Sequence, residues 1–406
     1  MPVSYLLFDL ILSKWDLIQL YSYPLIRHIE GSESFSFFER FSRFIITNYL
    51  KLIEIRRGFK MITINSKTKN CIIIALLFAF IVYVPSIASA RPLRMYAPDP
   101  ADSFKTLGLV DATKEIKKLT NGKIDIKVYP GGQLGGYEES VEEVRQGTIE
   151  LSATWLTKRW DPRLDLLNLP YYAPLGYDQL AKVAFSANSP LPKKIDSILE
   201  ELGLVSLGPW PESYATLIFA KGKRPESFTG FDNKKRSIRV PAMPLYRDTY
   251  VAMGYQTVTM DVSELWSAMQ TGQVDGASGQ PLENVYLLGK DIVKHVDANR
   301  SVCPPMWIMI NKDIWKSFSK EEQKIVRDTF NKHSLKTLKV MDQKDKEYAQ
   351  LLKKAGIEVA EYSDKDLAEF GAQIRKVVWP KYYDVFGKDF LKNLEKMVVE
   401  TSKAKK

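Results

Sequence analysis

The sequence predicts an α/β protein with two domains, each built on a helix-covered sheet. Alternating strand-like and helix-like segments begin after residue 91 and begin again near residue 217. From about residue 319 to the end, the pattern is helical. A chain of 406 residues with 45% apolar residues is also long enough for one large or two medium domains.

Residues 61–90 have the pattern of a secretory signal peptide. Lys67 and Lys69 precede an apolar run at 71–84, and small residues up to Ala90 allow cleavage there. The apolar run is shorter than the roughly 20 residues that a membrane-spanning helix needs. We therefore expect export and cleavage after Ala90, with an uncleaved membrane anchor as the alternative.

Residues 1–60 carry no recognisable motif. Because a signal peptide belongs at the N-terminus, we expect translation to start at Met61 and residues 1–60 to be an untranslated or spurious extension. Arg56-Arg57-Gly58 can be encoded by a purine-rich ribosome-binding sequence just upstream of that start. The alternative is a twin-arginine export signal at the same arginines.

The first α/β unit begins with a short strand at 94–97. A helix follows, with apolar residues at helical spacing from Leu109 to Leu119. A strand at 124–128, a second helix that ends near Gly147 and a strand at 149–153 come next. This strand–helix–strand–helix–strand order predicts a parallel sheet covered by helices.

The second unit repeats the alternation, with strands at 217–220 and 238–240, a helix at 262–271 and a strand at 274–277. Two α/β units in one chain predict a cleft between them, where ligands usually bind. In the C-terminal third, Ser319 opens a capping box at the start of a long helix.

Composition argues against several classes of function. The net charge is +10, or +6 beyond residue 90, and the charges are spread along the chain without an arginine-rich block. This distribution favours a small anionic ligand slightly and gives no reason to expect nucleic acid. Beyond residue 90 the sequence has only His295 and His333 and no nucleophile elbow or phosphate-binding loop. We therefore expect no catalytic residue, no metal and no cofactor.

Three further features receive ordinary structural interpretations. Cys303 is the one cysteine left after signal cleavage, and we expect a small buried residue without a disulfide. The glycines of 131–136 lack the spacing of a phosphate cradle and predict a turn before a helix. Glu212 is interpreted as a solvated loop residue.

Arg239 interrupts an apolar strand just before that strand ends at Pro241. Parallel strands are commonly buried on both faces, so an arginine there needs an anionic partner. Ligands of open α/β sheets lie beyond the carboxyl ends of the strands, where a guanidinium suits a carboxylate. Taken alone, the position is compatible with ligand binding or with a structural ion pair.

A series of short motifs, in order, resembles the solute-binding receptors of tripartite ATP-independent periplasmic (TRAP) transporters, of the dicarboxylate-receptor (DctP) type. The motifs are YPGGQLGG at 129–136, EEVRQG at 142–147, LNLPY at 167–171, FAK at 219–221, IRVP at 238–241, MG at 253–254, SELWSAMQTG at 263–272, VDG at 274–276, and INK at 310–312 with Trp315. They span roughly residues 91–320, and their order and spacing carry the resemblance.

The resemblance implies a bilobal periplasmic-binding-protein fold, with two α/β domains, a hinge and a long connecting helix. Domain I would comprise 91–216 completed by 306–345, and domain II 217–305 completed by 346–406. The function implied is a periplasmic receptor, expected to be a monomer, that binds a small organic acid and delivers it to the TRAP membrane subunits. The alternatives are a receptor for an ATP-driven transporter or a sensor kinase, and an exported enzyme on the same fold.

The resemblance also assigns residues. Arg239 matches the arginine with which the family clamps a ligand carboxylate, and Gln280 stands near the place of a ligand-facing asparagine. Many relatives have a second arginine near the place of Thr216, so Thr216 and the neighbouring Tyr214 join the candidates. Aromatic candidates for the cavity wall complete the set, with core packing as the alternative for each, and they are Tyr137, Trp155, Trp160 and Trp307.

With one arginine and several aromatic residues, the candidate site predicts a monocarboxylate with an apolar or aromatic body rather than a C4-dicarboxylate. If a dicarboxylate is preferred, Arg159 or Arg94 would have to replace the missing arginine.

Overall fold

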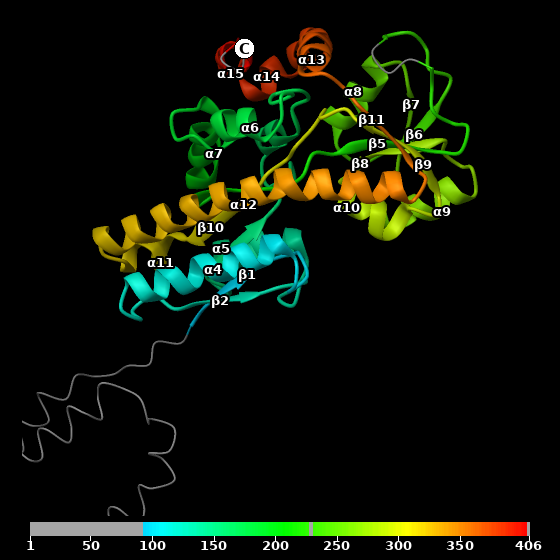
Figure 1. Cartoon of the computed structure of the whole chain (residues 1–406). Helices are drawn as coiled ribbons and strands as arrows, with labels where there is room; N and C mark the ends of the chain where they lie inside the picture. The colour runs from blue at the N-terminus through cyan, green and yellow to red at the C-terminus, as the bar shows by residue number, and fades with distance from the viewer. Residues whose placement is uncertain (1–91, 227–229, 404–406) are drawn as a thin grey trace, which may run out of the picture. The chain divides into compact units, whose positions relative to one another are not determined.

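The computed structural model describes residues 92–226 and 230–403, which belong to one compact unit (Figure 1). The predicted signal peptide and start site concern residues 1–90 and therefore lie outside the described residues. The described chain contains two sheets, and helices pack around both. No helix in this part of the chain is both long and apolar enough to span a bilayer.

The first sheet has the strand order β2-β1-β3-β10-β4. Its strands are β1 (Leu93–Tyr96), β2 (Ile126–Tyr129), β3 (Leu151–Thr154), β4 (Leu204–Trp210) and β10 (Met306–Asn311). β1 is parallel to β2 and β3, as the first α/β unit predicts, whereas β10 is antiparallel to both β3 and β4. A strand from late in the chain is therefore inserted between two earlier strands.

The second sheet has the order β11-β9-β5-β8-β6-β7. Its strands are β5 (Thr216–Ala220), β6 (Ser237–Val240), β7 (Gln256–Thr259), β8 (Gly276–Gln280), β9 (Val293–Ala298) and β11 (Glu358–Glu361). β6 is parallel to β7 and β8, so the carboxyl ends of these three strands lie at one edge. β5 is antiparallel to β8 and β9.

Both sheets are mixed, which corrects the prediction of a parallel sheet. A parallel neighbour requires a crossover that returns the chain to the same end of the sheet, usually through a helix. β5 and β10 lie where the chain passes from one sheet to the other, and each enters its new sheet from the opposite end. Short motif patterns indicate strands but carry no information on the direction of such inserted strands.

The helices largely follow the sequence pattern. The α-helices are α4 (Phe104–Leu119), α5 (Tyr137–Gln146), α6 (Tyr177–Ala184), α7 (Pro190–Glu201), α8 (Pro244–Ala252), α9 (Leu265–Gln270), α10 (Leu282–Asn284), α11 (Lys312–Ser317), α12 (Lys320–Lys354), α13 (Asp364–Val378), α14 (Tyr383–Phe386) and α15 (Lys388–Lys403). Shorter turns are η1 (Pro162–Asn168), η2 (Val262–Glu264), η3 (Val285–Gly289) and η4 (Trp379–Tyr382). In α4, Leu109 and Ile116 are buried as expected, but Leu119 at the last turn is 49% exposed.

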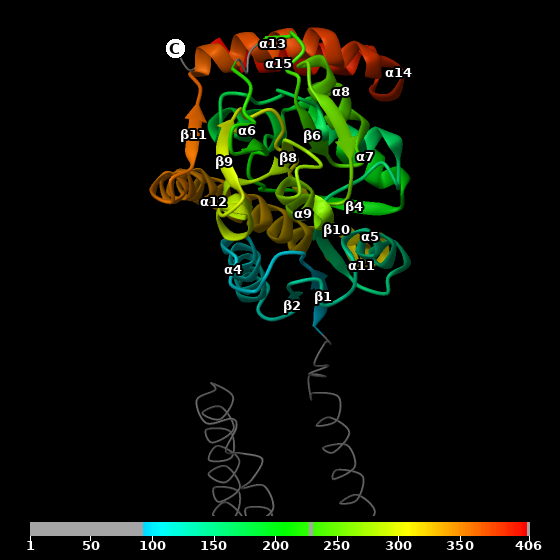
Figure 2. The ribbon, with the colours of Figure 1, turned by 90° about the vertical axis from the view of Figure 1, so that its right-hand side faces the viewer.

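The long helix α12 connects the two sheets. It contacts α4 and β4 beside the first sheet and α10 and β11 beside the second, and Figure 1 shows it passing along both. The predicted capping box is present, because the Ser319 hydroxyl accepts from the Glu322 amide while the Glu322 carboxylate accepts from the Ser319 amide. The C-terminal helices α13, α14 and α15 gather at one end of the molecule (Figure 2), where α15 contacts α6 and α7 and α13 contacts α8.

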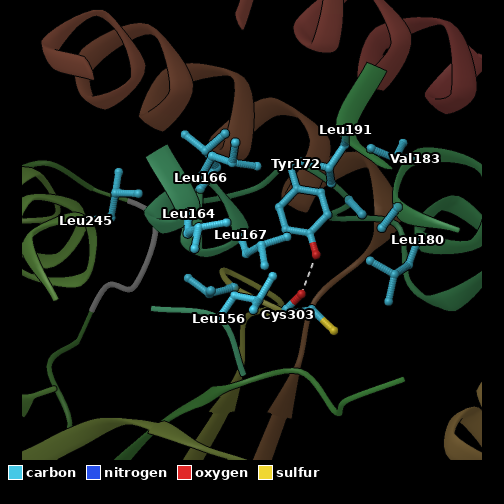
Figure 3. Close-up of a cluster of buried hydrophobic side chains, with 14 of the residues drawn as sticks. Leu156, Leu164, Leu166, Leu167, Tyr172, Leu180, Val183, Leu191, Leu245 and Cys303 are labelled. Carbon is cyan, nitrogen blue, oxygen red and sulfur yellow. Dashed lines mark hydrogen bonds between the residues drawn. The ribbon is translucent and has the colours of Figure 1, made fainter. Parts of the chain in front are cut away.

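The largest buried cluster lies among η1, α6 and α7 and continues to the loop before β10 (Figure 3). Leu164, Leu167 and Leu180 are fully or almost fully buried there. The Tyr172 hydroxyl donates to the backbone carbonyl of Cys303. This hydrogen bond connects the loop after η1 to the segment that leads into β10. Cys303 itself is 1% exposed, which confirms the prediction of a small buried residue.

Asp345 joins α12 to α6. Its carboxylate accepts from the Tyr177 hydroxyl, and it stands near Ser213 and Glu212 in the segment between β4 and β5. Burial raises the pKa of Asp345 to about 6, although the hydrogen bonds from Tyr177 and Ser213 oppose this increase. The unfolded chain should hold the proton only below the ordinary aspartate pKa of about 3.9.

We predict that Asp345 makes the protein less stable as the pH rises. Between about pH 4 and pH 6 the folded protein binds more protons at this site than the unfolded chain, so the free energy of unfolding falls with rising pH. Between pH 4.5 and 7.5, the free energy of unfolding should fall by about 2 kcal/mol less in Asp345→Asn than in the wild type, as measured by urea denaturation. Asp328→Asn, on the same helix and with a side chain that is 62% exposed, is the control. Equal pH dependence in wild type and Asp345→Asn would contradict the assignment.

Candidate functional site

A cavity of about 740 Å³ is lined by residues in or near the first sheet, by residues in or near the second sheet, and by α12. Contributing residues include Asp99 and Lys105 beside the first sheet, Arg239 and Gln280 in the second sheet, and Tyr348 in α12. The volume lies in the range of small-molecule sites, which is about 300–1,000 Å³. The cavity therefore has the position and size of a ligand site between two lobes.

Arg239 lies at the cavity because three parallel strands end there. Its Nε donates to the Met260 carbonyl, directly after β7, at 3.0 Å, and its Nη1 donates to the Ser278 carbonyl in β8 at 3.3 Å. The side chain is only 4% exposed, and burial lowers the pKa of its guanidinium. Among residues 92–226 and 230–403, no Asp or Glu forms an ion pair with Arg239. Tyr246 and Asp261 oppose the effect of burial on the pKa of Arg239 but do not reverse it.

Gln280 is the last residue of β8, whose register pairs Arg239 with Ala277. Its side chain is 3% exposed, and its Oε1 accepts from Asn284 Nδ2 at 3.4 Å. The Nε2 of Gln280 donates to no other residue in the part of the chain that the structure describes. Asn284 and Tyr246, which the motifs did not single out, also line the cavity near this edge.

Tyr137 and Trp155 form the aromatic part of the wall. Their rings meet edge to face, with centroids 6.0 Å apart, and both line the cavity. Tyr137 is the first residue of α5 and follows the glycine turn, while Trp155 follows β3 directly. Gly131, Gly132 and Gly135 have positive φ angles, which explains why this segment is a glycine-rich turn and supports its interpretation as such.

The other four candidates do not line the cavity. Trp307 is completely buried in the central strand β10 and donates to Ser206 Oγ at 2.8 Å. The Tyr214 hydroxyl donates to the Ala173 carbonyl at 2.5 Å, and Thr216 Oγ1 donates to the backbone carbonyl of Gln280 at 2.8 Å. Trp160 packs against the core with the Arg159 guanidinium 5.6 Å above its ring.

The arginines considered as replacements for the missing family arginine are also paired elsewhere. Arg94 binds Glu150 at 3.0 Å, and Arg159 binds Glu138 at 2.7 Å. Neither arginine lines the cavity. The second cation of the cavity is instead Lys105, which the sequence motifs did not indicate.

Lys105 stands in a buried ion cluster. Its Nζ lies 3.0 Å from each carboxylate oxygen of Glu212 and 2.9 Å from Asp99 Oδ1. Burial lowers the pKa of Lys105, but the charges of Glu212 and Asp99 raise it more, so the net result is above the usual range. Lys105 lies four residues before Leu109, on the apolar face of α4. A lysine on an apolar helix face was the one feature of the sequence that could have indicated this buried cluster.

Glu212 corrects the interpretation of this residue as a solvated loop residue. It is 7% exposed, and burial raises the pKa of its carboxyl even though Lys105 opposes the increase. Its carboxylate also accepts from the Ser213 amide at 2.9 Å. The segment between β4 and β5 has no regular secondary structure, but it crosses the interior, so a carboxylate there requires partners.

Comparisons with known proteins agree on one family. Residues 96–384 match the family described as bacterial extracellular solute-binding protein, family 7 (DctP). An uncharacterized protein of Haemophilus influenzae is 27% identical over 71% of this chain and 84% of its own length. The C4-dicarboxylate-binding periplasmic protein DctP of Rhodobacter capsulatus is 25% identical over 57% of this chain and 68% of its own length.

A solved structure resembles the fold. The TRAP periplasmic solute binding protein from Desulfovibrio salexigens, with bound orotic acid, matches 76% of this chain and 99% of its own chain, with a TM-score of 0.64 at 21% identity. This likeness confirms the predicted bilobal α/β fold. The predicted domain boundaries stay a prediction, because the described residues cluster as one unit. Together with the family match, these findings show that the chain belongs to the family 7 extracellular solute-binding proteins, the receptors of TRAP transporters.

Proposed function

We propose that the protein is a periplasmic receptor that binds a small carboxylate through Arg239 and delivers it, as a monomer and without a catalytic step, to the TRAP membrane subunits. The observation that carries this proposal is the state of Arg239. Its guanidinium is almost fully buried at a cavity, and among the described residues only backbone carbonyls accept its hydrogen bonds. Of the two interpretations left by the sequence, this geometry supports ligand binding over a structural ion pair.

The physical argument concerns an uncompensated charge. Burying a cation without a counter-ion is unfavourable, so a bound carboxylate gains an unusually strong interaction there. A guanidinium presents parallel donors that fit both oxygens of a carboxylate. Gln280 and Asn284 lie at the same edge of the sheet and would orient the ligand through their amides.

We predict that Arg239→Lys weakens carboxylate binding although the charge is retained, because the two-pronged donor is lost. The expected loss is about 1.5–3 kcal/mol, or roughly 10- to 150-fold in Kd, measured by calorimetry. Arg236→Lys, at a half-buried arginine just before β6 that does not line the cavity, is the control and should bind normally. Unchanged affinity in Arg239→Lys with a lower melting temperature would return Arg239 to a purely structural role.

The charges of the cavity support a monocarboxylate rather than a C4-dicarboxylate. Four carboxylates and two cations line it, a formal excess of two negative charges. The carboxylates are Asp99, Asp102, Glu212 and Glu283, and the cations are Lys105 and Arg239. Although the Rhodobacter capsulatus relative is a C4-dicarboxylate-binding protein, a second ligand carboxylate would here meet a wall of like charge.

In a thermal-shift screen, we therefore expect branched and aromatic monocarboxylates to stabilise the protein more than succinate or malate do. A ligand at 100 times its Kd should add about 2.7 kcal/mol of stability. Tyr137 and Trp155 would contact the apolar body. Stronger stabilisation by C4-dicarboxylates would refute this preference.

We further propose that the mature protein begins at Arg91. The test is mass spectrometry of the protein recovered from the periplasm. An N-terminal peptide that starts at Arg91 is expected, because the small residues before it suit signal peptidase. Peptides from residues 1–60 would disprove translation from Met61, and an intact Cys71 would disprove cleavage.

A further inference from the structure

We propose that the ligand carries an ammonium group at the end remote from its carboxylate, and that Asp99 and Glu283 bind this group. This inference rests on the proposed function, because Arg239 must hold the carboxylate end. It follows from three features of the cavity wall, namely the bonding of Lys105, the free carboxylate oxygens and the unused amide of Gln280.

Lys105 cannot serve a second ligand carboxylate. An ammonium group has three donors, and the Nζ of Lys105 already lies within 3.0 Å of three acceptors. Its partners Glu212 and Asp99 carry two formal negative charges against its single positive charge. The cluster therefore presents a net negative charge to the cavity, and it repels the second carboxylate of a dianion.

Asp99 still has an oxygen to offer. Its Oδ1 binds Lys105, whereas its Oδ2 accepts no hydrogen bond from any other residue in the described ranges. The Asp99 side chain is 17% exposed and lines the cavity, so the accessible part of this carboxylate belongs to the ligand space. An ammonium group is the ligand group that gains most from such an acceptor, because the hydrogen bond is charged at both ends.

Glu283 provides the corresponding oxygen from the second lobe. Its Oε1 accepts from the Tyr348 hydroxyl at 3.0 Å, which fixes α10 against α12. Within residues 92–226 and 230–403, Oε2 accepts no further hydrogen bond. Each lobe thus contributes one unused carboxylate oxygen to the same cavity. A cationic group between them would offset the excess negative charge that an ordinary monocarboxylate leaves uncompensated.

Gln280 is independent evidence that this cavity is built for a ligand. Its side chain is 97% buried, it lines the cavity, and its Nε2 has no acceptor among the described residues. Because Gln280 lines the cavity, this unused amide donor is available to an acceptor on a ligand. A ligand carboxylate held by Arg239 is such an acceptor.

The test is calorimetry with ligand pairs of equal shape. Straight-chain ω-aminocarboxylates are compared with carboxylates that have a methyl group in place of the ammonium, and 4-(aminomethyl)benzoate with 4-ethylbenzoate. The matching ω-hydroxy acids and dicarboxylates complete the series. We expect at least one amino member to bind at least about tenfold more tightly than its methyl counterpart, because it gains a hydrogen bond between charged groups.

Variants identify the residues responsible. Asp99→Asn and, separately, Glu283→Gln should each reduce the ratio between the affinities of the amino member and its methyl counterpart about tenfold. Asp111→Asn, exposed on α4 and away from the cavity, should keep the full preference. Arg239→Lys should weaken both members of a pair.

The outcomes separate the two proposals. If methyl or hydroxy members bind as tightly as amino members, or dicarboxylates bind more tightly, the ammonium site is refuted while the carboxylate receptor stands. A preference that persists in both acidic-residue variants also refutes it. If no carboxylate of any series binds, the proposed function itself fails.

Discussion

The site depends on one electrostatic constraint, the burial of the Arg239 guanidinium without a carboxylate partner from the part of the chain that the structure describes. Three parallel strands create it: β6 carries the arginine, and the carbonyls of Met260 and Ser278, at the ends of β7 and β8, accept its hydrogen bonds. These acceptors hold the side chain in place without neutralising its charge. The second sheet therefore holds a buried guanidinium whose charge, in our proposal, is neutralised by the carboxylate of a ligand.

The two buried cations of the cavity have opposite roles. Arg239 is poorly compensated, whereas Lys105 is fully compensated by Glu212 and Asp99. The cluster around Lys105 joins α4, the loop after β1 and the irregular segment between β4 and β5, so it stabilises the geometry of the wall while making that wall negative. The charges of the cavity wall therefore differ between its two sides, and in our proposal this difference orients an asymmetric ligand with its carboxylate toward β6.

Local patterns predicted much of the fold. The capping box at Ser319 and the strand alternation gave the correct elements because both depend on neighbouring residues. Strand direction depends on where the chain re-enters a sheet, and the insertion of β10 could not be read from its own residues. Among the site residues, Arg239 was identifiable as a charge inside an apolar strand. Glu212 was not, because a loop that crosses the interior has the same composition as one in solvent.

The aromatic candidates show the same limit. Trp155 and Trp160 stand five residues apart in one loop, yet one lines the cavity and the other packs on the core.

The most direct test of the account is a thermodynamic cycle that combines a binding monocarboxylate and its primary amide with wild type and Arg239→Gln. We predict a coupling free energy of at least about 1.5 kcal/mol between the ligand charge and Arg239. Additive effects, within about 0.5 kcal/mol, would contradict it.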